Sequence, residues 1–531
     1  MKSLYQTILA MTVPVLLLAG CSTDELDIEQ HGAITTSQYE TADDDGVKSL
    51  IAAIYANWHG DATITNGISG VKGEGNYRYL CTTLGSMSDE NADVYKYMDG
   101  SEGLLYRQFW EYFYRNCYWC NMLLTYLPDN QTCTPSLKTR VLAEARAMRA
   151  INMMYIVQLY GNAPLADHIL QGNEANTPAE QSWEFIDSEL AAAAEELPSK
   201  QDLNGQMAIG GRLTKEAAYA YLGKAYLWQG KYDEAAQTLY NKVIATGLYA
   251  LVSDFDSLNS SANDFSPENI FEFNFDDSGD NASSQEGAFD VIAFGVFNNW
   301  TKTYANPMMH YDYGRKFTKS FYDFMQAHDG ENSARYKGTL MEYYDLQENN
   351  MVSSLNYPAV DCMGYINVKY LCRTEDMVGN SPLNYCKANY VYMRYAEVLL
   401  NYAEAVAMGG SAGAMSGLEA LNLVRERAGL ADAPVLDMEN SDYGIKAERR
   451  AELVEEGCRW IDLVRWGDAP TVLKDVGKTS YTLQSMNGKG SYNVLETSTG
   501  GPGFIKGKNE LFPIPQSDLN ENKNLVQNTN W

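Results

Sequence analysis

The chain has 531 residues, and its 40 Lys and Arg against 69 Asp and Glu side chains give a formal net charge of −29. Such an acidic surface repels phosphate backbones, so the composition argues against nucleic-acid binding and against electrostatic attachment to an anionic membrane. The length is sufficient for a large core, arranged as one big domain or two intertwined ones.

The N-terminal segment has the features of a signal peptide that ends in a lipidation site. Lys2 precedes an apolar run over about residues 7–19, which is too short to span a bilayer, and the run ends in Leu-Ala-Gly before Cys21. This ending resembles a bacterial lipoprotein box, whose cysteine becomes residue one and carries acyl chains. We expect residues 1–20 to be removed, residues 21–42 to form a tether, and the lipid on Cys21 to be the only membrane attachment. An ordinary secretory signal with a chance cysteine is the alternative.

Helical patterns dominate the first half of the chain. Apolar periodicity predicts helices over residues 47–58, 104–127, 136–160, 181–196, 213–229 and 231–246. Within residues 212–245, small and aromatic positions recur in the order of a tetratricopeptide repeat: Tyr219, Leu222, Gly223, Tyr226, Tyr232 and Ala235. In such repeats, small residues let two antiparallel helices approach closely. We therefore predict a mainly α fold on a tetratricopeptide-repeat scaffold, with an N-terminal part over residues 43–250, rather than a chance amphipathic hairpin.

Two cysteines three residues apart raise the question of a redox or metal site. Cys117 and Cys120, in "CYWC", lie within the predicted helix 104–127, where residues three apart share one face. We expect both to pack as small hydrophobic residues. None of the five histidines lies in an H-E-x-x-H pattern, so the sequence predicts no metal site and no cofactor.

The composition changes after residue 250. Residues 269–275, "NIFEFNF", place Phe271, Phe273 and Phe275 on one side, which predicts a half-buried strand. Residues 276–388 are rich in Gly, Asn, Asp, Ser and Tyr without sustained periodicity, so we predict an irregular, ligand-facing region over residues 251–388. Helical patterns resume in residues 389–531, which end in a tail that we expect to be loop-like.

Residues 448–468, "ERRAELVEEGCRWIDLVRWGD", concentrate groups that could belong to an active site or to the scaffold. On one continuous helix, an apolar stripe would be formed by Leu453, Gly457, Ile461 and Val464. The charges would compensate one another in the pairs Glu455–Arg459 and Asp462–Arg465. We therefore predict a scaffold helix.

Catalytic motifs fail on spacing. "VGKTS" at residues 476–480 lacks the first glycine of a phosphate-binding loop, and no G-x-S-x-G motif occurs. These motifs identify no catalytic residues, and the absence of enzymatic activity is an expectation that comes from the family resemblance given below. A surface glycosidase remains an alternative, because its two carboxylates need only lie close in space.

Several strings together resemble the SusD/RagB family of lipoproteins. After the lipoprotein box they are "AEARAMRAINMMYIVQLYGNAPL", "RYAEVLLNYAEAVA", "ALNLVRERAGL", "ERRAELVEEGCRWIDLVRWG" and "LFPIPQSDLNENKNLVQN". The resemblance implies a tetratricopeptide scaffold that holds an irregular second half. It also implies a lipoprotein on the outside of the outer membrane that binds oligo- or polysaccharide and delivers it to a TonB-dependent, SusC-like transporter. The alternatives are a RagB-like peptide-binding lid and an adaptor that binds only proteins.

Ligand contacts are expected from aromatic residues in irregular stretches, because flat rings stack on sugar faces while charged groups bind the hydroxyls. The resemblance maps Arg78 onto a ligand-contacting arginine that precedes the Asp89-Glu90 turn. Asp93 stands where the starch-binding member has a tryptophan, and this departure argues against starch. Tyr95 and Tyr97 follow closely.

A second aromatic stretch, residues 296–317, falls where the family contributes its other stacking rings. Its candidates are Trp300, Tyr304, Tyr311 and Tyr313. We expect Arg78, Asp93, Tyr95 and Tyr97 to form one wall of a shallow groove, with Trp300 and Tyr311 opposite. For each ring, packing in the core is the alternative.

Overall fold

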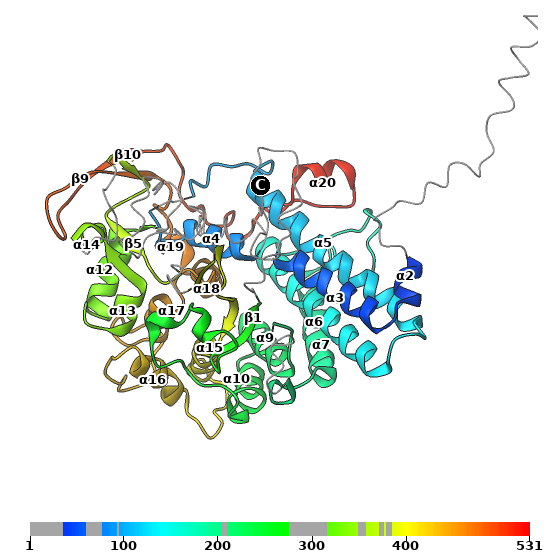
Figure 1. The fold of residues 1–531 in the computed structure, drawn as a ribbon. Helices are drawn as coiled ribbons and strands as arrows, with labels where there is room; N and C mark the ends of the chain where they lie inside the picture. The colour runs from blue at the N-terminus through cyan, green and yellow to red at the C-terminus, as the bar shows by residue number, and fades with distance from the viewer. Residues whose placement is uncertain are drawn as a thin grey trace, which may run out of the picture.

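The computed structural model describes residues 36–59, 77–92, 95–203, 211–274, 316–348, 357–370, 376–378 and 385–531. These residues form a helical half, which contains α2, α3, α5 to α7, α9 and α10, and a second half with short strands, short helices and the C-terminal elements (Figure 1). In the described part of the chain, no helix combines the length and the apolar character needed to cross a bilayer.

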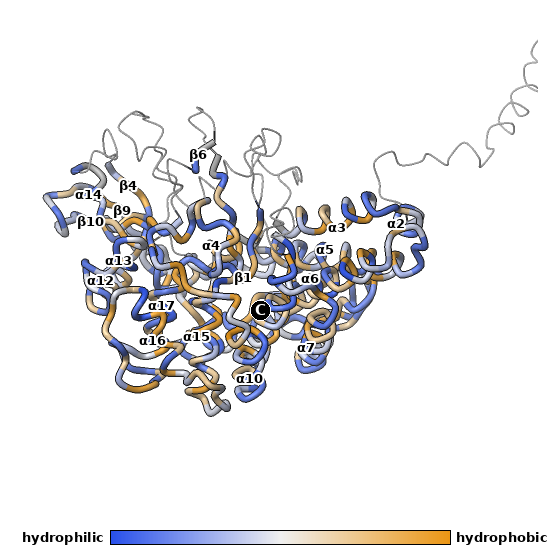
Figure 2. The backbone as a smooth tube through the Cα atoms, turned by 60° about the horizontal axis from the view of Figure 1, so that its bottom comes forward, coloured by the Kyte–Doolittle hydropathy of each residue, from blue (hydrophilic) through white to orange (hydrophobic). Residues whose placement is uncertain are grey.

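Antiparallel helices form the scaffold, and each packs against the next along the chain. They are α5 (Leu104–Tyr126), α6 (Pro135–Tyr160), α7 (Ala179–Glu196), α9 (Lys215–Trp228) and α10 (Tyr232–Lys242). The layer continues with α15 (Tyr395–Ala407), which packs against α10, and α16 (Gly417–Arg427), which packs against α15. The N-terminal helices α2 (Thr36–Thr41) and α3 (Asp44–His59) pack on α5. In Figure 2, apolar and hydrophilic stretches alternate along α3 and α5, as expected for helices with one face in a core.

The predicted tetratricopeptide hairpin is confirmed as a close approach of α9 and α10. A Cβ atom added at Gly223 would lie 2.4 Å from Leu239 Cδ2, so only glycine fits at this contact. Short 3₁₀ turns connect or follow the helices. They are η2 (Leu127–Asp129), η3 (Lys200–Leu203), η4 (Ile244–Thr246), η5 (Phe255–Ser257) and η6 (Ser261–Asn263).

The centre of the core is α6, whose residues 147–160 are all buried. Its neighbour α5 contributes Cys117 and Cys120, both fully buried. Burial raises the pKa of each thiol above its ordinary value, because the apolar surroundings disfavour a thiolate. The predicted packing role of these two cysteines is confirmed.

Short antiparallel strands organise the second half. One sheet pairs β1 (Asn269–Phe273) with β8 (Tyr390–Arg394). A second has the order β2 (Lys316–Phe317), β5 (Tyr365–Asn367), β3 (Leu340–Glu342). A third joins β4 (Ala359–Val360) to the hairpin of β9 (Thr479–Met486) and β10 (Tyr492–Ser498), and β6 (Met377–Val378) pairs with β7 (Tyr385–Cys386).

Short helices complete this half. They are α4 (Tyr77–Ser86), α12 (Lys319–His328), α13 (Ala334–Thr339), α14 (Tyr343–Glu348), α17 (Ile445–Glu452), α18 (Cys458–Trp466), α19 (Ala469–Val472) and α20 (Gln516–Glu521). The β9–β10 hairpin and α20 correct the expectation of a loop-like tail.

The strand predicted at residues 269–275 is present, but it is buried on both faces instead of one. Phe271 packs in a cluster of three rings with Trp58 and Tyr392, whose centroids lie 5.2 and 5.1 Å from its own and 5.4 Å from each other. On the other face, the Glu272 carboxylate is buried and accepts a hydrogen bond from Asn389 Nδ2 at 2.9 Å. Phe275 lies outside the described residues.

Candidate functional site

The chain that follows α4 joins the sheet of β2, β5 and β3 as an extra edge. Asn91 forms an antiparallel bridge with Phe317. The amide of Ala92 donates to the carbonyl of Lys316, and the amide of Thr318 donates to the carbonyl of Glu90, both at 2.8 Å. We call residues 90–92 with 316–318 the junction. The junction brings together the described ends of the two stretches in which the sequence places ligand contacts.

Asp89 fixes the junction to the C-terminal helices. Its carboxylate accepts hydrogen bonds from Arg450 at 2.8 Å and Arg459 at 3.0 Å, and its carbonyl accepts from the Thr318 hydroxyl at 2.9 Å. Burial opposes ionisation of this carboxyl, but the two guanidinium groups outweigh burial and hold its pKa well below the ordinary range. Asp89, from the Asp-Glu turn that marks the family's binding region, thus acts here as a structural anchor.

Glu90 is a buried carboxyl at the same place. Glu90 is 1% exposed. Burial raises its pKa to about 8, and the neighbouring Asp89 carboxylate adds to the rise, while Arg459 opposes it. At neutral pH the Glu90 carboxyl is therefore mostly protonated, so the junction carries a neutral acid beside a charged one.

Two of the predicted ligand contacts can be placed. Tyr95 is half-buried, and its hydroxyl lies 2.9 Å from the Asp99 carboxylate and 3.0 Å from the Tyr106 hydroxyl. Tyr97 is 2% exposed, and its hydroxyl donates to the carbonyl of Met87. The structure places Tyr97 in the core, which contradicts its predicted stacking on a ligand, because a stacking ring needs an open face.

The other predicted contacts stay predictions. Asp93, Trp300, Tyr304, Tyr311 and Tyr313 lie outside the described residues. Arg78 is in the first turn of α4, but its side chain lies outside the description. The sequence analysis did not predict the junction, although Lys316 and Phe317 stand at the end of the second aromatic stretch.

Residues 448–468 do not form the single helix that we predicted. Helix α17 ends at Glu452, Glu455 and Gly457 take left-handed conformations with φ of 66° and 74°, and α18 begins at Cys458. The break places α18 against α4, and a Cβ atom at position 457 would lie only 2.9 Å from Cys81 Sγ.

The charged pairs predicted in this segment fare differently. Asp462 and Arg465 are paired at 2.8 Å, which confirms that pair. Arg459 pairs with Asp89, next to the junction, and not with Glu455 as predicted. Both observations support the scaffold interpretation of the segment.

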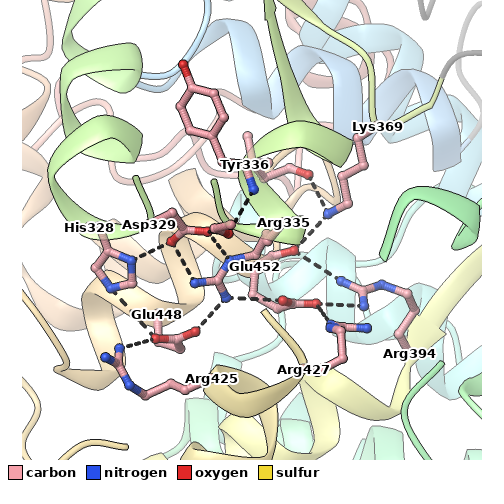
Figure 3. A network of polar contacts seen from close by, with 12 residues as sticks. His328, Asp329, Arg335, Tyr336, Lys369, Arg394, Arg425, Arg427, Glu448 and Glu452 are labelled. Carbon is pink, nitrogen blue, oxygen red and sulfur yellow. Dashed lines mark hydrogen bonds and ion pairs between the residues drawn. The ribbon is translucent and has the colours of Figure 1, made fainter. Parts of the chain in front are cut away.

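A buried ionic network joins α17 to the rest of the second half, as Figure 3 shows. At its centre, Arg335 of α13 donates to both oxygens of Asp329, at 2.9 and 2.8 Å. Arg335 also contacts Glu448 and, at 3.2 Å, Glu452, which both come from α17. The side chains of these four residues are 0% exposed.

Further arginines complete the network around the two glutamates. Glu448 accepts from Arg425 of α16 at 2.7 Å, and Glu452 accepts from Arg394 at 2.9 Å and from Arg427. Burial opposes ionisation of Glu452, but Arg427, Arg394 and Arg335 outweigh it and lower the pKa to about 2. Every charged group in the network is paired with a group of opposite charge, so the network links α13, α16 and α17 to β8. Within the described residues, no three His, Cys, Asp or Glu side chains are grouped so that they could hold a metal ion.

The SusD family model matches residues 267–531, which contain β1, β8 and every element from α15 onward. The chain belongs to the SusD family. The SusD match includes all the motif strings quoted between residues 394 and 528, so the resemblance seen in the sequence is confirmed.

Relatives and solved structures agree with this assignment. SusD-like protein P2 of Formosa agariphila is 27% identical over 414 residues, which cover 73% of each chain. A laminarin-binding SusD-like protein superposes with a TM-score of 0.68 at 24% identity, over 92% of this chain and 99% of that one. Surface glycan-binding protein A of Bacteroides thetaiotaomicron, in complex with laminarihexaose, superposes with a TM-score of 0.69 at 20% identity, over 92% of this chain and 100% of that one. The SusD fold, mainly α on a tetratricopeptide scaffold, is thus established for this chain.

Proposed function

We propose that this protein captures oligosaccharide at the surface of the outer membrane and delivers it to a TonB-dependent, SusC-like transporter without hydrolysing it. The observation that carries the proposal is the junction, where Ala92 meets Lys316 at 2.8 Å. It pairs residues 90–92, within the Arg78–Tyr97 stretch, with residues 316–318, which follow Tyr313, so ligand contacts from both stretches can converge on one groove. Membership of the SusD family supports the same function.

The proposed groove has one wall with Arg78, Asp93 and Tyr95, and an opposite wall with Trp300 and Tyr311. Tyr304 and Tyr313 belong to the same second stretch. The Arg78 guanidinium donates to sugar hydroxyls and the Asp93 carboxylate accepts from them, while the rings stack on pyranose faces. Tyr97 is left out of the groove because its ring is buried.

The first test is calorimetry with laminarihexaose, because a structural neighbour was determined with that ligand. Oligosaccharides from α-glucan, mannan and xylan and a set of short peptides complete the panel. Loss of one stacking ring costs about 1–3 kcal/mol by analogy with aromatic–base stacking. We therefore expect Trp300→Ala to weaken binding of the best oligosaccharide about tenfold or more, with an unchanged melting temperature.

Trp228→Ala is the matched control, because the Trp228 indole packs against Trp183 in the scaffold with ring centroids 6.3 Å apart. It should lower the melting temperature and leave affinity unchanged. Unchanged affinity with a lowered melting temperature in Trp300→Ala would assign Trp300 to the core. Binding of peptides alone would support the RagB-like alternative, and steady release of reducing ends from polysaccharide would support the glycosidase.

Anchoring and partnership are tested in cells. Incorporation of labelled palmitate should disappear in Cys21→Ala, and the wild-type protein should fractionate with the outer membrane and copurify with a large barrel protein. Label retained by Cys21→Ala contradicts the lipid anchor. Copurification without any barrel contradicts the transporter partnership.

A further inference from the structure

The helical half carries a second concave surface, which is built on α5 and does not include the junction residues. Its floor is an aromatic row on α5, in which Trp110, Tyr114 and Tyr118 follow one another at intervals of four residues. One wall is the segment between α6 and α7, and the other is α20 with the residues that follow it; Figure 1 shows α20 beside α5. This half-open cavity has a volume of about 330 Å³, within the lower range of small-ligand sites.

Hydrogen bonds within the protein hold the walls of this cavity in place. Trp110 Nε1 donates to Asp518 Oδ1 at 2.8 Å, which ties α5 to α20. The Tyr114 hydroxyl donates to the carbonyl of Pro164 at 2.7 Å. Asn522 Nδ2 donates to the carbonyl of Glu174 at 2.7 Å, which ties the two walls together. The cavity is therefore preorganised, and a ligand does not have to order it.

Three side chains of the lining keep their polar groups uncommitted. Tyr118 is 42% exposed, and its hydroxyl has no hydrogen-bond partner among the described residues. In the same part of the chain, the half-buried Arg115 forms no ion pair or hydrogen bond, although its Nε is shielded from solvent. The exposed Glu521 carboxylate likewise accepts no hydrogen bond from a described residue.

The charges of the lining restrict the chemistry of the ligand. The Glu174 carboxylate accepts hydrogen bonds from two backbone amides, and the Asp518 carboxylate accepts one from Trp110. The uncommitted charges of the lining are therefore Glu521 and, on the floor, Arg115, which have opposite signs. A neutral ligand with an apolar face suits the aromatic floor. Hydroxyls around its edge can accept from Arg115 and donate to Glu521.

We propose that this cavity is a carbohydrate site that binds a single neutral sugar ring, with Tyr118 stacking on the sugar face. It is separate from the proposed groove, and its existence does not depend on the groove. A chain with two such sites can hold one glycan at two points, which raises the effective concentration of the glycan at each.

The test uses ¹⁹F NMR of the purified protein with fluorotryptophan at its nine tryptophan positions, with the Trp110 signal assigned through Trp110→Phe. The probes are D-glucose, D-galactose, D-mannose and N-acetyl-D-glucosamine, with N-acetylarginine amide and inorganic phosphate as a cation and an anion. We expect at least one sugar to shift the Trp110 signal saturably. Tyr118→Ala should weaken that binding about tenfold or more, as expected for one stacking ring, and Arg115→Ala should weaken it as well.

Leu423→Ala, at an exposed position on α16, is the control that should bind as the wild type does. The proposal is overturned if no sugar shifts the Trp110 signal up to its solubility limit, or if the cation or the anion binds more tightly than every sugar. A saturable shift that persists unchanged in both Tyr118→Ala and Arg115→Ala overturns it too, because the sugar then binds elsewhere. If Trp300→Ala loses oligosaccharide binding but still shows the sugar-induced shift of the Trp110 signal, the cavity on α5 binds sugar independently of the groove.

Discussion

Removal of the Arg335 side chain is the sharpest test of the buried ionic network. In Arg335→Met, the three neighbouring carboxylates differ in how many positively charged partners they retain. Glu448 retains Arg425, and Glu452 retains Arg394 and Arg427. Asp329 loses the only arginine that bonds to it among the described residues, and keeps His328 at 2.7 Å and the Ser333 hydroxyl at 3.0 Å. The substitution thus leaves mainly one stranded carboxylate.

The expected cost follows from that stranded charge. Arg335 and the three acids around it are withdrawn from water, and removal of one partner from such a buried pair costs about 3–5 kcal/mol. Asp329→Asn in the same chain removes the stranded charge, so the double variant should regain a large part of the loss.

The sign of the pH dependence is also fixed. Burial opposes ionisation of Asp329, but Arg335 outweighs it and lowers the pKa, so the pair contributes stability above the ordinary pKa of an aspartate and loses it as the pH falls. The difference between wild type and Arg335→Met should therefore shrink in acid.

Urea unfolding followed by tryptophan fluorescence measures these free energies. Lys319→Met is the matched control, because the Lys319–Asp323 pair is more than half exposed and such pairs contribute about 0–1 kcal/mol. If Arg335→Met is within about 1 kcal/mol of the wild type, like the control, then the network is not the anchor that the geometry indicates.

Two further variants test the junction and the scaffold. The Glu90 carboxyl is protonated in the folded protein up to a pH of about 8. Its contribution to folding stability is therefore fully present below its ordinary pKa of 4.5 and is lost as the pH rises through 8. Across that window the wild type should lose up to about 4 kcal/mol relative to Glu90→Gln, and parallel urea curves for both proteins from pH 5 to 8 would contradict this. In Gly223→Ala, the new methyl group would clash with the Leu239 side chain. The cost of overpacking, about 1–3 kcal/mol of unfolding free energy, should exceed the gain of about 1 kcal/mol from the higher helix propensity of alanine, so the variant should be less stable. A raised melting temperature would show that Leu239 gives way.

Local periodicity was sufficient to predict the scaffold helices. The helix predicted at residues 104–127 spans Leu104–Tyr126, and the one predicted at 136–160 spans Pro135–Tyr160. Helix α5 repeats apolar positions over many turns, and α6 is apolar enough to be buried throughout residues 147–160, so errors at single residues do not shift either prediction. The order of tetratricopeptide positions around Gly223 was likewise sufficient to predict the hairpin, because α9 and α10 are neighbours in the sequence and contact each other.

Features that depend on distant partners were not predictable. The break after Glu452 depends on Cys81 against Gly457, and Arg459 selects Asp89, which lies 370 residues away in the sequence. Tyr97 and Tyr118 could not be assigned from sequence, because the same residue type serves as core in one case and as an exposed ring in the other. The cavity on α5 was missed for the same reason, since its far wall comes from α20.

The return of the C-terminal region to the helical half has a consequence for biogenesis. Helix α15 packs on α10, the amide of Phe512 donates to the carbonyl of Leu159 at 2.6 Å, and Asn528 Nδ2 donates to the carbonyl of Tyr160 at 2.9 Å. The end of α6 is therefore covered only after residues 512–528 have been synthesised. A ribosome-bound chain that stops short of them exposes apolar helix surface and has large loops still to close. Such a chain cannot complete its core until residues 512–528 have been added.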